Sequence, residues 1–242
     1  MFPDFSSRRV LVVGGSSGIG LAAARAFAGH GADVTIASRN GDKVAAAVAT
    51  ASEGARGTVT GAMLDTTDDD QVARFFAASQ PWDHIVVSAA QTPTGQVRTL
   101  PLADAYAAFN SKFWGAYRVA RAAQFREGGS LTLVSGFLAT RPSKSSVLQG
   151  AINAAVEAIG RGLALELSPI RVNTVSPGLI ATPLWDKLEA GARQSMYEGA
   201  AANLPARRVG QPEDVANAIL YLAGTPFATG STVLVDGGGS IG

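Results

Sequence analysis

The sequence predicts a doubly wound α/β fold, in which a seven-stranded parallel sheet carries helices on both faces. Two observations lead to this prediction. Short apolar runs of strand type alternate with longer, alanine-rich stretches of helical type along the 242 residues. No low-complexity linker and no internal repeat interrupts this alternation. We therefore expect one domain that spans residues 1–242, near the upper size limit for one hydrophobic core.

The expected strands are short and apolar, and helices are expected between them. The strands cover residues 9–13, 33–37, 59–64, 84–88, 130–135, 171–175 and 232–235. The helices lie near residues 19–29, 42–52, 68–78, 102–125, 147–167, 183–202 and 212–223. These elements fill the chain and leave no room for a separate substrate domain. Open α/β sheets bind ligands at the carboxyl ends of their strands, so we expect the substrate pocket there, with a substrate loop at about 182–206.

Composition excludes several kinds of partner. With 20 Lys and Arg against 19 Asp and Glu, the formal net charge is +1, and no basic block is present to neutralise the phosphates of a nucleic acid. There is no cysteine, so a disulfide or a thiol nucleophile is impossible. The only histidines, His30 and His84, lie far apart in sequence. We expect both to be structural and expect no metal site.

No segment has the length or composition of a membrane span or an export signal. The apolar run at residues 10–13 is too short for a signal peptide and ends at Gly14. The charge-free stretch 215–235 is interrupted by turn residues near Pro226 and Gly230, so it reads as a helix, a turn and a strand. We expect no membrane partner and a cytoplasmic location.

A glycine-rich turn joins the first expected strand to the first expected helix. It reads Gly14-Gly15-Ser16-Ser17-Gly18-Ile19-Gly20. Such a tight turn needs residues without a Cβ, and a helix N-terminus offers free N–H groups and a positive dipole end to a pyrophosphate. Glycine alone fits any tight turn, but its place between a strand and a helix predicts a dinucleotide site of the Rossmann type.

The Gly-x-x-x-Gly-x-Gly spacing resembles that of the short-chain dehydrogenase/reductase family, and later motifs extend the resemblance to nearly the whole chain. Asp65 resembles the family's aspartate that binds the adenine amino group. Pro177-Gly178-Leu179-Ile180-Ala181-Thr182 is similar to the family's Pro-Gly-x-x-x-Thr loop, whose threonine holds the nicotinamide carboxamide. Residues 208–216 and 233–238 resemble its C-terminal signature. The resemblance implies a Rossmann oxidoreductase that forms a homodimer or homotetramer.

The end of the second strand indicates which dinucleotide to expect. A carboxylate there would bind the ribose of NAD and repel a 2′-phosphate, but this chain has Ser38 and Arg39. A hydroxyl and a guanidinium suit NADP(H), although Arg39 could also be a solvated charge at the start of a helix. Small residues follow the fourth strand, where the family usually has amide side chains. The expected cofactor-binding residues are Gly14, Ser16, Ser17, Gly18, Ile19, Ser38, Arg39, Asp65, Thr66, Ser88, Ala89, Ala90, Pro177, Gly178, Ile180 and Thr182.

The positions expected to carry the chemistry depart from the family's usual Asn, Ser, Tyr and Lys. In the family, Tyr donates a proton to the substrate carbonyl, Lys lowers the Tyr pKa, and Ser stabilises the oxyanion. Here Gln149 and Asn153 occupy the positions of the Tyr-x-x-x-Lys motif. Gly136 occupies the Ser position, although a shift of one residue would place Ser135 there.

Lys112 occupies the family's Asn position when Gly115 is matched to the Asn-x-x-Gly pattern, whereas a slip of two residues would keep Asn110. The first match implies an exchange, in which Lys moves to the Asn position and Asn153 to the Lys position. Lys112 could be a partly exposed helix lysine beside a lost active site. Alternatively, its ammonium fills the volume of the missing lysine, where burial could tune it. The candidate catalytic residues are Lys112, Ser135, Gln149 and Asn153.

An amide cannot donate a proton near neutral pH as a phenol does. We therefore expect an NADPH-dependent reductase of a carbonyl, an imine or iminium, or a conjugated C=C group. Its proton relay is non-standard: the proton comes from Lys112, Ser135 or water, or none is needed. The alternatives are a non-catalytic NADP(H)-binding sensor or interaction protein, and a cofactor-holding isomerase or lyase.

Apolar side chains in the substrate-loop region predict a small, largely apolar substrate. Tyr residues in the fourth helix and the loop are expected to pack rather than to act as replacement acids. The apolar residues expected near the substrate are Leu184, Trp185, Met196 and Tyr197, and Phe137 could join them. The tyrosines expected to pack are Tyr106, Tyr117 and Tyr197.

Overall fold

The computed structural model of the chain describes residues 4–242, so the first three residues of the predicted domain lie outside the description. Its centre is one seven-stranded sheet with the order β3-β2-β1-β4-β5-β6-β7, and all neighbouring strands pair in parallel. The strands are β1 (Arg9–Val13), β2 (Asp33–Ser38), β3 (Val59–Met63), β4 (Trp82–Val87), β5 (Phe125–Val134), β6 (Arg171–Pro177) and β7 (Thr232–Val235). This topology confirms the predicted fold class.

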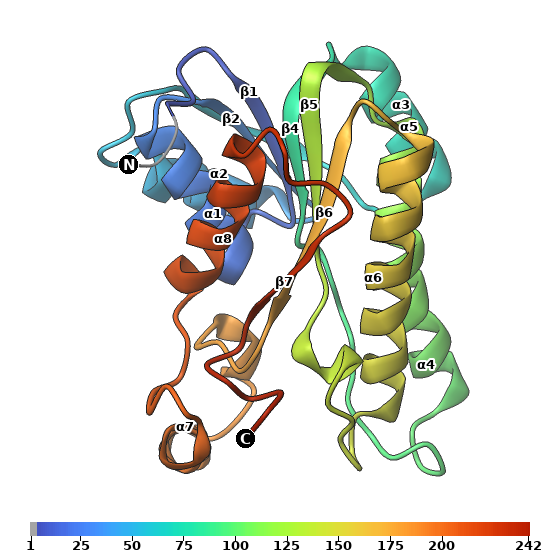
Figure 1. Cartoon of the computed structure of the whole chain (residues 1–242), viewed down its shortest axis with the longest axis vertical. Coiled ribbons are helices and arrows are strands. Elements are labelled where there is room, and N and C mark those ends of the chain that lie inside the picture. The colour runs from blue at the N-terminus through green and yellow to red at the C-terminus, as the bar shows by residue number, and fades with distance from the viewer. Residues whose placement is uncertain (1–3) are drawn as a thin grey trace.

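Helices cover both faces of the sheet (Figure 1). They are α1 (Gly18–Gly29), α2 (Gly41–Ser52), α3 (Asp69–Ala78), α4 (Leu102–Phe109), α5 (Gly115–Ala122), α6 (Val147–Glu166), α7 (Ala190–Asn203) and α8 (Pro212–Gly224). α1, α2 and α8 lie on one face, and α3, α5 and α6 lie on the other. Successive residues of β1 alternate between the two cores: Val12 belongs to the first and Leu11 to the second. The central strands β1, β4 and β6 are therefore buried on both sides.

The long helix predicted at 102–125 is interrupted. α4 passes into a π-helical segment, Asn110–Trp114, before α5 continues from Gly115. The N–H of Gly115 donates to the carbonyl of Asn110, five residues earlier. The prediction was wrong here because the flanking residues keep α-helical dihedral angles, so the hydrophobic period does not reveal the wider turn. Such turns occur frequently at functional sites.

Two other predicted boundaries were wrong. α5 ends at Ala122, and β5 begins at Phe125, because Phe125 pairs with Trp82 at an irregular register that includes a left-handed Gly128 with φ +74°. The predicted helix at 183–202 divides into a 3₁₀ turn, Pro183–Trp185, and α7. The indole N–H of Trp185 donates to the carbonyl of Ile180 at 2.9 Å, which ties this turn back to the end of β6.

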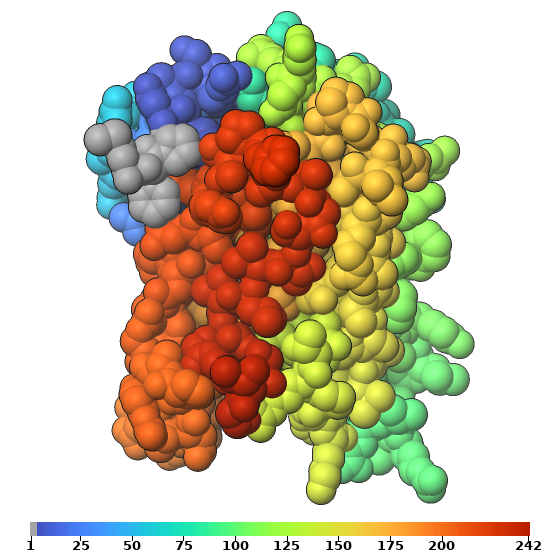
Figure 2. Space-filling view, viewed as in Figure 1, coloured from blue at the N-terminus to red at the C-terminus, as the bar shows by residue number. Residues whose placement is uncertain are grey.

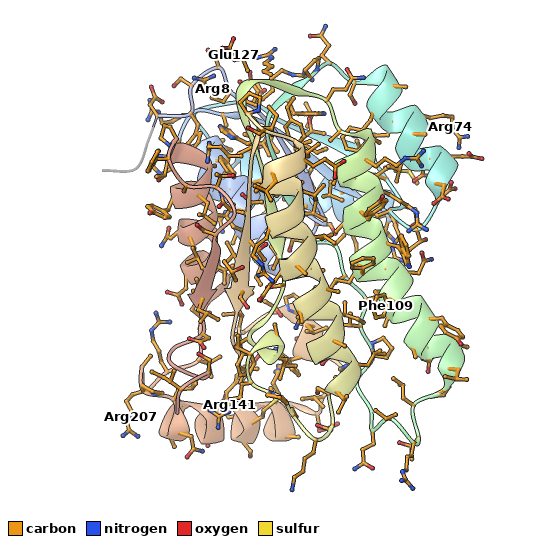
Figure 3. The ribbon with its side chains drawn as sticks, turned by 45° about the vertical axis from the view of Figure 1, so that its right-hand side comes forward. Arg8, Arg74, Phe109, Glu127, Arg141 and Arg207 are labelled. Atoms are coloured by element: carbon orange, nitrogen blue, oxygen red, sulfur yellow. The ribbon has the colours of Figure 1, made fainter. Side chains whose placement is uncertain are left out.

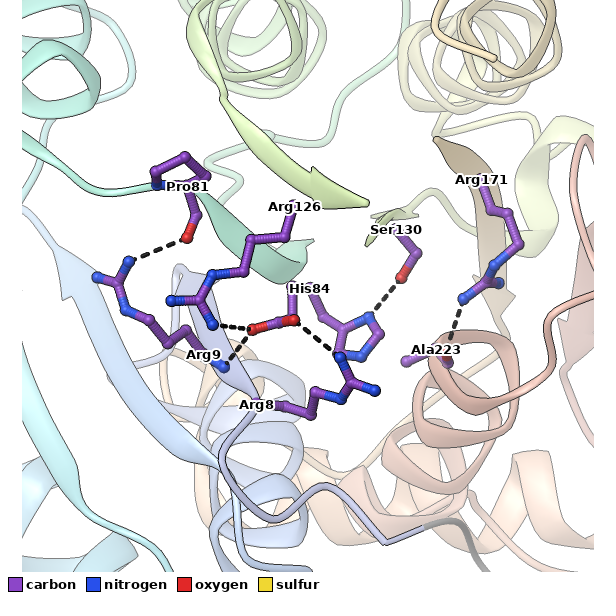
Figure 4. A network of polar contacts seen from close by, with 9 residues as sticks. Arg8, Arg9, Pro81, His84, Arg126, Ser130, Arg171 and Ala223 are labelled. Atoms are coloured by element: carbon purple, nitrogen blue, oxygen red, sulfur yellow. Dashed lines mark hydrogen bonds and ion pairs between the residues drawn. The ribbon is translucent and has the colours of Figure 1, made fainter. Parts of the chain in front are cut away.

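A buried ionic cluster joins the amino ends of the central strands (Figure 4). Its centre is the carboxylate of Asp83, and this residue is only 3% exposed. The carboxylate accepts hydrogen bonds from Nη1 of Arg8 at 3.1 Å and from Nη1 of Arg126 at 3.2 Å. It also accepts a hydrogen bond from the backbone N–H of Arg9 at 2.8 Å. Because β1, β4 and β5 each begin near these residues, the cluster fixes the strands relative to one another.

His84 and Arg171 extend this region of polar contacts. Nδ1 of His84 lies 2.9 Å from Oγ of Ser130, and burial lowers the pKa of His84 to about 4, so its imidazole is neutral at physiological pH. Arg171 donates to the carbonyls of Leu222 and Ala223, each at 2.6 Å, at the C-terminal end of α8. These contacts are consistent with the structural role expected for His84. Among the described helices, none is long and apolar enough to cross a membrane.

Candidate functional site

The candidate site lies at the carboxyl edge of the sheet, where the loops after β1, β2, β4, β5 and β6 meet. β1 pairs with β2 on one side and with β4 on the other, so the chain reverses its winding direction between β1 and β4. A doubly wound sheet opens a crevice at such a point, and ligands bind there. The candidate catalytic and cofactor-binding residues lie at the ends of β2 and β6, in the loops after β1 to β6, in the first turn of α1, in α6, or in the π-helical segment before α5.

The glycine-rich turn after β1 is packed so closely that side chains could not replace its glycines. Gly14 has a φ of +82°, and a Cβ at this position would lie 2.4 Å from the backbone nitrogen of Ala89. A Cβ on Gly20 would lie 2.2 Å from the carbonyl oxygen of Gly14. Both distances are far below a van der Waals contact. The turn therefore brings the start of α1 against the residues that follow β4.

The N-terminus of α1 has no side-chain cap, unlike those of α2 and α3. The capping residues Asn40 and Asp68 accept backbone N–H groups in those two helices, whereas Ser17 makes no such bond in α1. The first N–H groups of α1 therefore lack a side-chain partner and are available to an anion. Thr182 lies across this turn, since a Cβ on Gly18 would be 3.2 Å from its Cγ2. The first turn of α1 and the loop after β6 thus enclose one site.

Ser38 and Arg39 lie next to this turn at the end of β2. Oγ of Ser16 donates to Oγ of Ser38 at 3.1 Å, which joins the glycine-rich turn to β2. Arg39 is exposed and makes no hydrogen bond or ion pair within the described chain. The two hydroxyls and the guanidinium form a group of donors with no carboxylate among them. This group could hold a phosphate monoester.

The other expected cofactor residues shape the crevice in different ways. Asp65 accepts hydrogen bonds from the backbone and the hydroxyl of Thr67, at 2.9 and 2.7 Å, so one of its oxygens is engaged locally. Thr66 is buried against Gly115. The remaining residues are near the crevice through their backbone: Ser88 and Ala89 contact Gly14, Ala90 is exposed, Pro177 ends β6, Gly178 packs against Asp236, and Ile180 is buried.

Lys112 and Asn153 are in direct contact. Nζ of Lys112 donates to Oδ1 of Asn153 at 2.6 Å and to the carbonyl oxygen of Ser135 at 2.7 Å. Burial lowers the pKa of Lys112 to about 8, and the nearby charge of Glu157 opposes this shift. The π-helical segment thus delivers its lysine to the start of α6, at the end of β5. Lys112 is not a solvated helix lysine.

A buried carboxylate lies behind this contact. Glu157 is 7% exposed, and its Oε1 accepts hydrogen bonds from the hydroxyls of Ser135, at 2.8 Å, and of Ser176, at 2.9 Å. Ser135 therefore connects two charged groups, because its carbonyl accepts from Lys112 while its hydroxyl donates to Glu157. The hydroxyl of Ser135 is thereby directed into the protein. Ser135 therefore lies between the opposite charges of Lys112 and Glu157.

The glycine at position 136 is required by the same arrangement. A Cβ on Gly136 would lie 2.7 Å from Nδ2 of Asn153, and this amide is held in place by Lys112. A serine at position 136 would therefore push Asn153 away from Lys112. The departures from the family pattern at 112, 136 and 153 are physically coupled.

Gln149 lies one helical turn before Asn153 and contacts the loop after β4. Its Nε2 donates to the carbonyl oxygen of Thr92 at 2.9 Å and to the hydroxyl of Thr92 at 3.1 Å. Since α6 continues through both residues, Gln149 and Asn153 lie on the same face of the helix. The carboxamide is therefore fixed against Thr92, one helical turn from the residue that binds Lys112.

The apolar residues expected around the substrate are only partly brought together. None of the residues of α7 is buried, and Leu184 is 55% exposed. In Figure 1, α7 lies at the end of the molecule, away from the sheet. Phe137 is adjacent to the C-terminal residues, because a Cβ on Gly239 would lie 3.5 Å from its ring. Arg141, labelled in Figure 3, donates to the carbonyl of Gly239 at 2.6 Å. In Figure 2 the C-terminal residues, in dark red, lie against the yellow-green segment that follows β5.

The tyrosines of the fourth helix pack only in part. Tyr106 is 69% exposed and Tyr117 is 43% exposed. The ring of Tyr117 packs edge to face against that of Trp114, with 5.6 Å between the ring centres. Neither is placed beside Lys112 or Gln149 by any contact within the described residues.

A hollow of about 320 Å³ lies next to β7, away from the Lys112 cluster. It is lined by Leu179, Ile180, Ala206, Arg208, Gly210, Asp214, Leu234, Val235, Asp236, Gly237 and Gly238. Its charged groups are already paired, since Arg208 donates to both oxygens of Asp214 and Asp236 accepts from two backbone N–H groups. The described residues also contain no cluster of His, Asp and Glu suited to a metal ion.

Sequence reasoning missed two members of the site, Glu157 and Thr92. Glu157 follows Asn153 by one helical turn in an otherwise apolar stretch, and a carboxylate at such a position is a signal that could have been used. Thr92 gives no comparable signal. It lies in an irregular loop, and only the three-dimensional structure brings it to Gln149.

Relatives of known sequence match nearly the whole chain. Residues 13–240 match the family model described as Enoyl-(Acyl carrier protein) reductase. The chain is 30% identical to the 3-oxoacyl-[acyl-carrier-protein] reductase FabG of Chlamydia trachomatis, and the match covers 96% of this chain and 97% of that protein.

Solved structures have the same fold over the same extent. A small-chain dehydrogenase in complex with NADPH is 32% identical and has a TM-score of 0.82, covering 98% of this chain and 100% of the other. L-sorbose reductase from Gluconobacter frateurii, complexed with NADPH and L-sorbose, is 25% identical and has a TM-score of 0.90, covering 100% of both chains. The similarity includes every element of the candidate site.

Proposed function

Since the chain belongs to the short-chain dehydrogenase/reductase family, we propose that it is an NADPH-dependent oxidoreductase with a non-standard proton relay. It transfers a hydride to a carbonyl, an imine or iminium, or a conjugated C=C group of a small, largely apolar substrate. The contact between Lys112 and Asn153 carries this proposal. Because Lys112 contacts Asn153, which occupies the family's lysine position, its ammonium group lies near the place of the missing lysine. Lys112 itself belongs to a different helical segment. A site that had simply lost its chemistry would not need to bury this charge.

The residues of the crevice fit an NADP(H) molecule. The uncapped first turn of α1 would hold the pyrophosphate, Ser38 and Arg39 the 2′-phosphate, and Thr182 the nicotinamide end. The relatives solved with NADPH support this choice of dinucleotide. When bound, the cofactor supplies the hydride. The protein binds it, orients it and keeps the reacting groups together.

Lys112 acts as the charged group beside the reacting centre, and Asn153 fixes its position. Lys112 has three N–H donors, of which two are engaged by Asn153 and Ser135. The third is available to a cofactor hydroxyl or to the substrate. Ser135 acts as a positioning residue, because its hydroxyl is bound to Glu157. For a ketone, the proton would therefore come from Lys112 or water.

The proposal is tested with the purified full-length protein. Dissociation constants for NADPH and NADH are measured first, and NADPH is expected to bind more tightly. NADPH oxidation is then followed with a panel of ketones, enones and cyclic imines. Turnover of any of these supports the oxidoreductase. Tight NADPH binding without turnover of any member would overturn it in favour of a sensor.

We also propose that the protein forms a homodimer or homotetramer through α4, α5 and α6. Exposed large apolar side chains follow this surface, and such patches mark protein interfaces. They are Leu102 (69% exposed), Tyr106 (69%), Trp114 (47%), Tyr117 (43%) and Val147 (51%). Sedimentation equilibrium at micromolar protein concentration tests this proposal, and a monomer would overturn it.

A further inference from the structure

We propose that the reacting group of the substrate is an N–H donor, as in a protonated imine, and that Oε1 of Gln149 accepts its hydrogen bond. This inference rests on the proposed function and selects one of its three substrate classes. It depends on the orientation of a single carboxamide.

The contacts with Thr92 fix which end of the Gln149 carboxamide is free. A backbone carbonyl can only accept a hydrogen bond, so the group 2.9 Å from the carbonyl of Thr92 must be Nε2. Nε2 also donates to the hydroxyl of Thr92 at 3.1 Å. Both contacts hold the nitrogen end of the carboxamide against Thr92. Oε1 has no hydrogen-bond partner among residues 4–242, and it is not one of the buried unpaired atoms, so it remains accessible.

An accessible oxygen at this position favours a donor over an acceptor. The family places a phenol here, and a phenol donates to a substrate oxygen. The carbonyl oxygen of a ketone would instead meet the carbonyl oxygen of Gln149, and neither atom has a hydrogen to share. A protonated imine presents an N–H, and hydrogen bonds from charged donors are stronger than those from neutral ones.

The charges near Gln149 are compatible with a cationic substrate. Lys112 and Glu157 are the charged side chains of the adjoining cluster, and their opposite charges offset one another. The engaged N–H groups of Lys112 are directed to Asn153 and Ser135. An iminium group next to Oε1 of Gln149 therefore adds one positive charge to a cluster that is close to neutral.

The reaction of this substrate class needs no proton donor. The iminium carbon accepts a hydride from C4 of the dihydronicotinamide, so one C–H bond breaks on the cofactor and one forms on the substrate. The π electrons of the C=N bond become the lone pair of the nitrogen. The products are a neutral amine and the oxidised cofactor. This balance matches a site in which a carboxamide stands in place of an acid.

The test compares three probes of similar shape with NADPH: protonated 3,4-dihydroisoquinoline, its N-methyl iminium salt and 2-tetralone. We expect the N–H iminium to be reduced with a kcat/KM at least about tenfold above those of the other two. In Gln149→Leu, this value should fall about tenfold to a hundredfold, whereas that of the N-methyl salt stays within about threefold. Gln149→Glu keeps an oxygen acceptor and should retain the preference for the N–H iminium.

A binding measurement separates this inference from the proposed function. With NADP⁺ present, calorimetry should show that tetrahydroisoquinolinium binds more tightly than isochroman, its neutral oxygen analogue, and that Gln149→Leu removes the difference. Thermal melting and NADPH affinity confirm that the variant is folded. If the ketone is reduced as efficiently as the N–H iminium, or if Gln149→Leu leaves the ratio of N–H to N-methyl substrate unchanged, the inference is wrong and the reductase stands. If the wild-type protein neither binds NADPH nor reduces any of the probes, both proposals are overturned.

Discussion

Two buried polar clusters lie at opposite edges of the same sheet, and they arrange their charges differently. At the amino edge, Asp83 contacts the guanidinium groups of Arg8 and Arg126 directly, at 3.1 and 3.2 Å (Figure 4). At the carboxyl edge, Ser135 lies between Lys112 and Glu157 and binds each of them through a different atom. The first cluster pairs its charges, and the second keeps them apart.

This difference separates structural from functional use of buried charge. Direct pairing satisfies a buried carboxylate and leaves little capacity for a ligand. Separation leaves Lys112 with an unused N–H and a pKa lowered by burial, and both properties suit a group that contacts a reacting molecule. The amino-edge cluster should therefore determine stability, and the carboxyl-edge cluster should determine activity.

The largest expected effect is the loss of activity in Lys112→Met. Methionine has similar length and fills the same volume without an ammonium group. We expect kcat/KM to fall by about a hundredfold or more, which corresponds to about 3 kcal/mol of transition-state stabilisation. Steady-state kinetics with a substrate from the panel measure this fall.

The control for this variant is Lys144→Met, which changes an exposed lysine in the loop between β5 and α6. It should leave kcat/KM unchanged. The melting temperature of Lys112→Met should fall, because buried Glu157 loses its nearby opposite charge and Asn153 and Ser135 lose a donor, so kcat/KM is compared at a temperature where both proteins are folded. Retention of wild-type kcat/KM in Lys112→Met would mean that the two clusters do not differ in function.

The next effect is expected at the other edge. Asp83→Ala removes the common partner of Arg8, Arg9 and Arg126, and we expect it to lower the free energy of unfolding by about 2–3 kcal/mol. Because Arg8 and Arg126 are partly exposed, they can turn to solvent, which limits the loss. Urea denaturation measures the change, and kcat/KM of the folded fraction should not change. The matched control is Glu127→Ala, which removes an exposed carboxylate next to Arg126 on β5 (Figure 3). It should change the free energy of unfolding by less than about 0.5 kcal/mol.

An exposed charge on the carboxyl edge should affect a ligand and not the fold. Arg39 has no protein partner in the described chain, so Arg39→Ala should leave the melting temperature unchanged. The loss of its contact with a 2′-phosphate should weaken NADPH binding about tenfold, or about 1.4 kcal/mol, and leave NADH binding unchanged. Fluorescence titration with both dinucleotides measures this difference. The control is Arg74→Ala, at an exposed arginine on α3 (Figure 3), which should alter neither affinity. If Arg39→Ala weakens NADH binding as much as NADPH binding, Arg39 does not bind the 2′-phosphate.

The sequence predicts the frame of both edges better than the contacts inside them. The alternation of apolar runs predicts the seven parallel strands because burial on both faces requires those runs. The π-helical turn at Asn110–Trp114 leaves no trace in that pattern, since the residues at its two ends and those flanking it keep α-helical dihedral angles. The 3₁₀ turn Pro183–Trp185 is tied to Ile180 by a hydrogen bond from the indole of Trp185, and the hydrophobic pattern does not reveal that bond.

The candidate site shows the same limit. Lys112 and Asn153 could be paired from the sequence, because both occupy positions of one known pattern. The carboxamide orientation of Gln149 could not be predicted, because Thr92 lies 57 residues away in an irregular loop. The need for glycine at position 136 is also a three-dimensional property, since it arises from the position of the Asn153 amide.

The smallest expected effect tests whether the separated charges act on one another. Burial lowers the pKa of Lys112 to about 8, and the charge of Glu157 raises it, so Glu157→Gln should place this pKa below 8. If activity requires the protonated amine, it is present below this pKa and is lost as the pH rises through it. The variant should therefore lose activity at lower pH than the wild type, with a roughly twofold smaller kcat/KM at pH 8 and little change at pH 6. Ser176→Ala removes a hydroxyl bound to Glu157 and keeps the charge, so its pH profile should have the wild-type midpoint. If the midpoint of the pH profile shifts in both variants, the profile reports packing around α6. If it shifts in Glu157→Gln alone, the charge of Glu157 raises the pKa of Lys112 across Ser135.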